Sequence, residues 1–216
     1  MRKSQSGFTL VEIAIVLVII GLLLGGVLKG QELVNSAKVK NMIVDLQTPQ
    51  ILIYGYQDKY KAIPGDDVNA VLHVGASATL TPTAATLGNG RLEGNFNSVT
   101  ATDETLAFWQ QVRLAGLSTG STDFSTPSAA VPRNAEGGRV GIQSTSPINT
   151  MTGTYFVCSD GISGKLAKQI DVTLDDGNTF TGSTRVMATG YIGTALDAVA
   201  TAAIVDSTNY TVCVSY

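Results

Sequence analysis

The sequence predicts an α+β fold, in which a long N-terminal helix packs on a small antiparallel sheet with one or two extra helices. Three observations support this prediction. An apolar run near the N-terminus continues into a one-sided helical stripe, and Pro64 and Gly65 then end that pattern. The remaining chain alternates short β-prone runs with two helix-like segments. A long helix followed by such a mixture favours an α+β head.

The first element is the apolar run, residues 8–28, which are 21 residues with Glu12 as the only charge. As a helix it is about 31 Å long, which matches a bilayer core. Arg2 and Lys3 precede it and should keep the N-terminus in the cytoplasm. Three interpretations are open here: a cleaved signal peptide, a plain signal anchor, and a membrane segment that later joins a filament. No A-x-A site follows Leu28, and a plain anchor has no reason to contain Glu12.

The residues around Glu12 favour the third interpretation. The sequence G-F-T-L-V-E at residues 7–12, after a short basic leader, resembles the processing site of type IV prepilins. The resemblance implies that a prepilin peptidase cuts between Gly7 and Phe8 and that the Phe8 amine is then methylated. It also implies a helical filament with the apolar helices at its centre. Within it, Glu12 can neutralise the Phe8 amine of a neighbouring subunit, since either charge buried alone is costly.

The chain then divides into four parts. Residues 1–7 are the leader, residues 8–28 the transmembrane and filament-core helix, residues 29–62 its amphipathic continuation, and residues 63–216 the extracytoplasmic α+β head. Four glycines near the end of the apolar run form two small-xxx-small pairs, Gly21/Gly25 and Gly26/Gly30. They either let this segment stretch in the filament or only assist packing in lipid.

The amphipathic continuation is predicted from apolar residues that recur at steps of three and four. These are Val39, Met42, Leu46, Pro49, Ile53, Tyr56 and Tyr60. Aromatic residues at this spacing are usually core, so we interpret the tyrosines as packing residues.

The head contains two predicted helices. Thr102 can cap a helix that carries Leu106, Trp109 and Val112 on its apolar face. Ser163 can cap a second helix that closes at Gly177. Short β-prone runs at residues 139–143, 155–158, 184–187 and 210–214 predict the antiparallel sheet.

Cys158 and Cys213 each lie in one of those runs. In an exported chain, two cysteines most economically form one disulfide. The bridge would enclose 54 residues and stabilise the fold by about 4 kcal/mol. By resemblance, type IV pilins also tie down a C-terminal region with one disulfide.

The charge and the residue composition argue against nucleic-acid binding and against enzymatic activity. The chain has 216 residues and a net charge of −3, which argues against a large nucleic-acid surface. His73 is predicted to lie in a polar loop with no companion, so we expect it to have no ligand or catalytic role, and we expect no enzyme. We also expect no cofactor.

Two short acidic segments, Asp66-Asp67 and Asp175-Asp176-Gly177-Asn178, offer oxygen ligands, and some relatives of pilins bind calcium in their heads. Neither segment has EF-hand spacing, so both are interpreted first as turn and helix-end residues.

The resemblance implies a structural subunit of a bacterial type IV pilus, used in adhesion, motility or DNA uptake. A pseudopilin of a type II secretion system and a minor pilin have the same N-terminus and stay as alternatives. The implied partners are other copies of the chain in a helical homopolymer, the prepilin peptidase, and the assembly platform with its ATPase. The implied location is the inner membrane before assembly, with the N-terminus in the cytoplasm, and an extracellular fimbrium afterwards.

Overall fold

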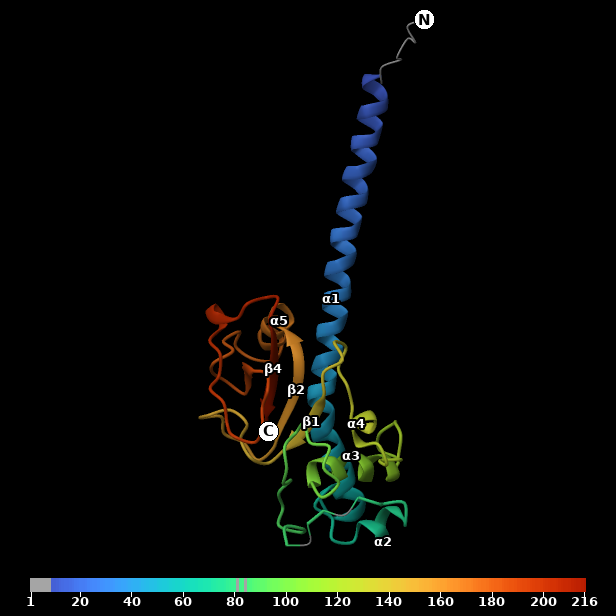
Figure 1. Cartoon of the computed structure of the whole chain (residues 1–216), viewed down its shortest axis with the longest axis vertical. Coiled ribbons are helices and arrows are strands. Elements are labelled where there is room, and N and C mark those ends of the chain that lie inside the picture. Colours follow the sequence, from blue (N-terminus) through green and yellow to red (C-terminus); the bar gives the residue numbers. More distant parts are fainter. Residues whose placement is uncertain (1–8, 81, 84) are drawn as a thin grey trace, which may run out of the picture. The chain divides into compact units, whose positions relative to one another are not determined.

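The computed structural model describes residues 9–80, 82, 83 and 85–216. The chain divides into an N-terminal unit, Met1–Lys38, and a head unit, Val39–Tyr216. Helix α1 (Leu10–Tyr60) is 51 residues long and contributes to both units (Figure 1). The predicted long helix is therefore present, and it ends two residues before the predicted boundary at residue 62.

The head-unit part of α1 buries the predicted stripe. Seven of its residues are buried, and Tyr60 is half-buried. The helix also continues through Pro49. The seven residues are Val39, Met42, Leu46, Pro49, Leu52, Ile53 and Tyr56. Leu52 is an addition to the predicted stripe, because it lies three residues after Pro49 and four residues before Tyr56, on the same face of the helix.

The head contains a four-stranded antiparallel sheet in the order β1-β2-β4-β3. Its strands are β1 (Val140–Gln143), β2 (Phe156–Ser163), β3 (Thr184–Ala188) and β4 (Asn209–Ser215). All four predicted runs are strands, and β2 extends five residues beyond its predicted end. The last strand, β4, lies between β2 and β3, so the C-terminal segment is part of the centre of the sheet.

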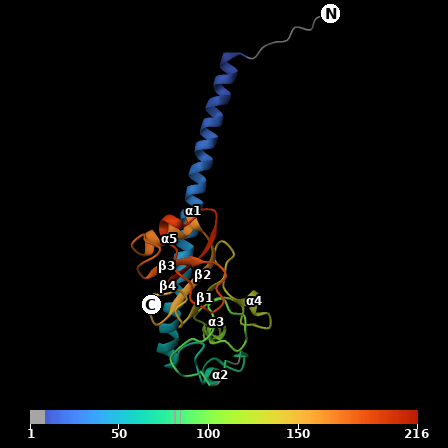
Figure 2. The ribbon, with the colours of Figure 1, turned by 60° about the vertical axis from the view of Figure 1, so that its left-hand side comes forward.

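Both faces of the sheet are buried, because successive side chains of a strand point to opposite faces. Val157 and Val212 join one core cluster, to which α1, α3 and α5 also contribute. Cys158 and Cys213 join a second cluster with Phe96 and other residues outside the strands. Figures 1 and 2 show the sheet lying against the head-unit part of α1.

The helices of the head differ in detail from the prediction. The structure has α2 (Ala70–Val74), α3 (Glu104–Leu114), α4 (Pro127–Ala130), α5 (Gly164–Leu174) and a 3-10 turn, η1 (Thr201–Ala203). The N-cap position of α3 is Asp103, so the prediction of Thr102 was wrong. Ser163 does occupy the N-cap position of α5, but its side chain makes no capping hydrogen bond. Trp109 is buried in the core, as predicted.

Candidate functional site

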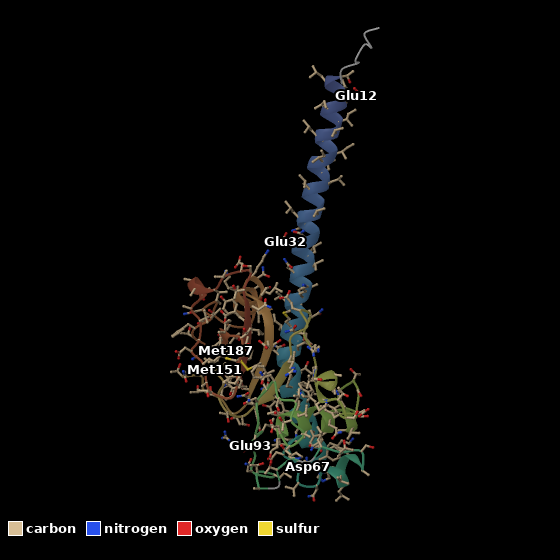
Figure 3. The ribbon with its side chains drawn as sticks, in the orientation of Figure 1. Glu12, Glu32, Asp67, Glu93, Met151 and Met187 are labelled. Atoms are coloured by element: carbon tan, nitrogen blue, oxygen red, sulfur yellow. A yellow bond between two sulfur atoms is a disulfide. The ribbon has the colours of Figure 1, made fainter. Side chains whose placement is uncertain are left out.

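The apolar part of α1 has no protein partner in the described chain. An 18-residue window of this helix has a mean hydropathy of 2.8, and none of it is buried. Its large aliphatic side chains stand out into open space along the segment between Glu12 and Glu32 (Figure 3). A helix that is apolar on all sides is stable when lipid or other helices surround it. Length and composition therefore make this segment a candidate membrane span.

The first turn of α1 is closed by a reciprocal pair. The Thr9 backbone N–H donates to Glu12 Oε2 over 2.8 Å, and the Glu12 backbone N–H donates to Thr9 Oγ1 over 3.3 Å. The Thr9 hydroxyl also donates to Glu12 Oε2 over 2.8 Å. This arrangement is a capping box, which satisfies two N–H groups that the helix leaves free. The S/T-x-x-E spacing was visible in the sequence, but our prediction for Glu12 considered only a partner in another subunit.

The predicted cleavage site lies outside the described residues. Gly7 and Phe8 are the two sides of the cut, and Phe8 is the predicted methylation site. These assignments therefore remain predictions. Glu12 is among the described residues and lies within the first turn of α1. A negative charge at this end of a helix also interacts favourably with the helix dipole.

The four glycines of the apolar segment have free space around them. A Cβ atom built on Gly21, Gly25, Gly26 or Gly30 would have no neighbour within 4 Å outside its own helix. Among the residues that the structure describes, nothing requires these positions to be small. Close approach of a second helix is a role that they can fill.

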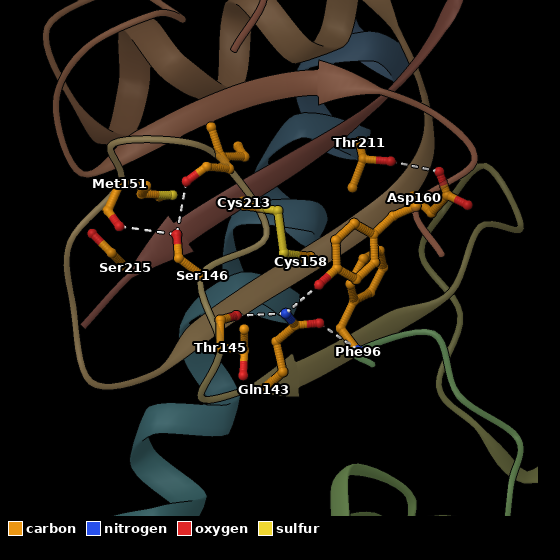
Figure 4. The surroundings of a disulfide bond; sticks show 12 residues. Phe96, Gln143, Thr145, Ser146, Met151, Cys158, Asp160, Thr211, Cys213 and Ser215 are labelled. Atoms are coloured by element: carbon orange, nitrogen blue, oxygen red, sulfur yellow. Dashed lines mark hydrogen bonds between the residues drawn. A yellow bond between two sulfur atoms is a disulfide. The ribbon is translucent and has the colours of Figure 1, made fainter. Parts of the chain in front are cut away.

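The disulfide lies on the face of the sheet that is turned away from α1. Cys158 and Cys213 are directly opposite each other on β2 and β4, and a disulfide joins them. Both are fully buried, beside Phe96 and Met151 (Figure 4). The bridge therefore links the central C-terminal strand to its neighbour inside a packed cluster.

Asp67 is the centre of a buried polar group near the end of α1. Its Oδ2 accepts a hydrogen bond from the Tyr56 hydroxyl over 2.7 Å and lies 2.7 Å from Nδ1 of His73. Burial, followed by this bond to Asp67, raises the pKa of Tyr56. The ring of Tyr60 stacks on His73, with 5.1 Å between the centroids. The expectation that His73 has no companion was wrong, because α2 brings it back to the end of α1.

Asp66 holds the turn at residues 88–90. Its carboxylate accepts hydrogen bonds from the backbone N–H groups of Gly88, Asn89 and Gly90. An open cavity of about 490 Å³ lies beside Asp66 and Asp67. Both carboxylates already accept protein hydrogen bonds, so their visible role is to connect α1 to this turn.

A second pair of acids lies at the start of α3, where Glu104 is buried and Glu93 is half-buried. Glu104 is 1% exposed, and its carboxylate accepts hydrogen bonds from the Glu93 backbone N–H over 3.0 Å and the Thr86 hydroxyl over 2.7 Å. Burial, together with the nearby Glu93 carboxyl, raises the pKa of Glu104 to about 7. Burial also acts to raise the pKa of Glu93, but hydrogen bonds from Glu104 and Asn89 lower it overall. The sequence contained no local signal for this pair, because α3 brings the two residues together.

The third acidic group is at the end of α5. Asp175 and Asp176, which the sequence offered as oxygen ligands, lie beside Asp171. We did not predict a role for Asp171. Asp171 lies four residues before Asp175, about one helical turn. This spacing is the sequence signal that could have predicted that the two carboxylates lie together.

Comparison with known families finds one match. Residues 2–28 match the prokaryotic N-terminal methylation motif. This motif is the signature of type IV pilins and pseudopilins. Neither the curated proteins nor the solved structures gave a match to the chain. The motif, together with the unburied apolar helix that it opens, supports a type IV pilin-like or pseudopilin-like precursor.

Proposed function

We propose that the protein is the structural subunit of a bacterial type IV pilus. A prepilin peptidase cuts between Gly7 and Phe8, the Phe8 amine is methylated, and the subunit passes from the inner membrane into a helical surface filament. The observation that carries this proposal is the methylation motif directly before a long, wholly unburied apolar helix. Such a helix fits two environments in turn, lipid before assembly and other copies of itself afterwards.

The details of the apolar segment support assembly. Removing residues 1–7 also removes Arg2 and Lys3 and leaves one amine on Phe8. Glu12 is then the only side-chain charge of the apolar segment, so a pair with a neighbour's Phe8 amine would neutralise both charges. The open space around Gly21 and Gly25 would allow neighbouring helices to approach closely. The chain's role is then structural, as it is in the family of this motif.

A pseudopilin of a type II secretion system is the second candidate, and a minor pilin is the third. The surface pilus is favoured by the head. Its Ser- and Thr-rich segment at residues 118–129 is mostly exposed, as expected for a displayed and variable surface. The disulfide also suits a subunit that faces an oxidising environment.

The test uses cells that express the full chain. Surface fibres are sheared off, imaged by negative-stain electron microscopy and analysed by intact mass. We expect fibres built of a subunit that lacks residues 1–7 and carries one methyl group on Phe8. A mature N-terminus after Leu28 contradicts the proposal. Correctly cut subunit that stays in the periplasm, in cells that make other pili, instead supports the pseudopilin.

A further inference from the structure

A polar groove lies between the head-unit part of α1 and the chain that runs from α3 to β1. One cavity in it, of about 310 Å³, has side chains of α1, α3 and the following loops in its lining, among them Asp45, Thr48, Trp109, Arg113 and Arg133. A second cavity, of about 360 Å³, shares Asp45 and Arg133 with the first. Pockets that bind small molecules in proteins start at about 300 Å³. The groove is therefore large enough for a small polar ligand.

Arg113 is held in this groove without being neutralised. Its Nη1 donates to the carbonyl oxygens of Ser121 and Ala130, each over 2.8 Å, and its guanidinium lies over the ring of Phe124. A Cβ atom on Gly120 would lie 2.8 Å from Nε, which is buried without a hydrogen-bond partner. Nη2 makes no hydrogen bond within the described part of the chain, where Arg113 also has no acidic partner. Its orientation is therefore fixed, while its positive charge stays available to a ligand.

The other two charged groups of the groove also lack a counter-charge. Arg133 donates to the carbonyl oxygens of Gly137 and Ser128, over 2.7 and 3.3 Å. Asp45 is half-buried, its carboxylate accepts no hydrogen bond from a described residue, and burial raises its pKa. The lining thus presents two guanidiniums and one carboxylate. A ligand that satisfies all three needs a negative group for the guanidiniums and a hydrogen-bond donor for Asp45.

We propose that this groove binds an acidic sugar, which is a sugar ring that carries a carboxylate. Arg113 and Arg133 bind the carboxylate, because the planar guanidinium matches it in shape and charge. Asp45 accepts hydrogen bonds from ring hydroxyls, and Trp109 offers an apolar surface to the C–H groups of the ring.

The lining disfavours two simpler ligands. An inorganic anion such as sulfate has no donor for Asp45 and is repelled by its charge, and the ammonium group of an amino acid is repelled by the two guanidiniums. The hydroxyls of a sugar are donors without a charge, so they avoid both penalties. This proposal concerns the head alone and does not depend on the role of the chain in a filament.

The experiment uses the full-length protein in a detergent without a sugar headgroup. Trp109 is the only tryptophan of the chain, so its fluorescence reports directly on the groove. Sodium D-glucuronate is titrated, and binding is followed by tryptophan fluorescence and by isothermal titration calorimetry. We expect a Kd of about 1 mM, as is usual for a ligand of this size. D-glucose, sodium sulfate and glycine should each bind at least about tenfold more weakly, because each lacks one of the required groups.

The decisive variant is Arg133→Gln, which removes one guanidinium from an exposed position and should therefore fold. Its affinity for glucuronate should fall at least about tenfold, since a charge-assisted hydrogen bond is lost. Arg185→Gln is the matched control. Arg185 also donates to a backbone carbonyl, that of Gly182, but it lies on β3, at the opposite edge of the sheet from β1. This control should bind glucuronate like the wild type.

A second variant, Arg113→Lys, tests the other guanidinium. It keeps the positive charge but loses the planar fork, so its affinity for glucuronate should also fall, and thermal unfolding shows whether the variant is folded. Absence of glucuronate binding by the wild type at about 10 mM, ten times the expected Kd, overturns the proposal. Equally tight binding of glucose, sulfate or glycine overturns it, as does binding that leaves the fluorescence of Trp109 unchanged. Unchanged affinity in either folded variant overturns it as well.

Discussion

Thr9 and Glu12 cap the start of α1 by bonding each other's backbone N–H groups, over 3.3 Å and 2.8 Å. Before assembly, the Glu12 carboxylate therefore has a partner within its own chain. A pair with the Phe8 amine of a neighbouring subunit would have to share or replace that bond. The Glu12 carboxylate can thus have two separate roles: it caps its own helix, and it pairs with the Phe8 amine to fix the position of a neighbouring subunit. Two different substitutions can distinguish these roles.

Glu12→Ala should reduce assembly sharply and leave membrane-held subunit in place. The substitution lowers the cost of placing this segment in lipid, but it leaves the neighbour's amine without a counter-charge, which costs several kcal/mol. Glu12→Asp should give an intermediate defect because its carboxylate reaches less far. Immunoblots of sheared fibre against membrane-held subunit measure the ratio for each variant. Equal ratios in Glu12→Ala and wild type would show that Glu12 does not fix the position of neighbouring subunits in the filament.

Thr9→Ala is the matched control for capping. It removes the hydroxyl and weakens the cap by about 1 kcal/mol, yet it leaves the Glu12 carboxylate free to reach a neighbour. We expect assembly close to that of the wild type, once it is normalised to the amount of cut subunit. If Thr9→Ala assembles as poorly as Glu12→Ala, the defect of the latter comes from helix capping.

Cys158→Ser should loosen the head without affecting membrane insertion. The bridge joins β2 to β4, and β4 is a central strand, so its loss should cost about 2–5 kcal/mol of unfolding free energy. Limited proteolysis of the full-length protein in detergent should release C-terminal fragments faster than from the wild type. Labelling of both thiols of the wild type by an alkylating agent without reductant would show that the bridge is absent.

Leu46→Ala tests the packing of α1 on the rest of the head. Leu46 is fully buried in the main core cluster, and truncation of such a residue costs about 2–5 kcal/mol. Val44→Ala lies two residues away on the same helix, where Val44 is exposed, and should cost much less. Thermal unfolding followed by near-UV circular dichroism compares the two. Similar losses in both variants would mean that α1 does not pack through the Leu46 face.

Glu104 should make the stability of the head depend on pH. Its pKa is raised from 4.5 to about 7 in the folded state, so the folded protein binds more protons than the unfolded chain between these values. Stability from this group is therefore present at acid pH and is lost as the pH rises from about 4.5 through 7. Glu104→Gln removes the titration. Denaturant unfolding at pH 5 and pH 7.5 should show the wild type losing stability relative to Glu104→Gln at the higher pH.

The opposite trend would contradict this assignment. Glu93, whose pKa is lowered, acts in the other direction: its contribution is present at higher pH and is lost on acidification. A wild type that gains stability relative to Glu104→Gln as the pH rises would show that folding does not raise the pKa of Glu104.

The sequence by itself determined the elements that depend on local pattern. The apolar segment of α1 was readable because a helix that crosses a bilayer needs about 20 apolar residues in succession. The buried stripe that includes Met42 and Leu46 follows from the 3.6-residue period of a helix, and the four strands follow from runs of β-prone residues. The ends of elements were misplaced, such as the N-cap of α3 at Asp103 and the end of β2 at Ser163, because several neighbouring residues can cap or end an element.

Only the tertiary structure decided which distant residues meet. The position of β4 between β2 and β3 depends on strand pairing across long stretches of chain, for which alternation within one strand carries no information. The bond between Asp67 and His73, the burial of Glu104 beside Glu93, and the unpaired carboxylate of Asp171 have the same origin. A side chain's solvation and its neighbours are set by packing, so the charge state and the ligands of these acids became definable only once the head was folded.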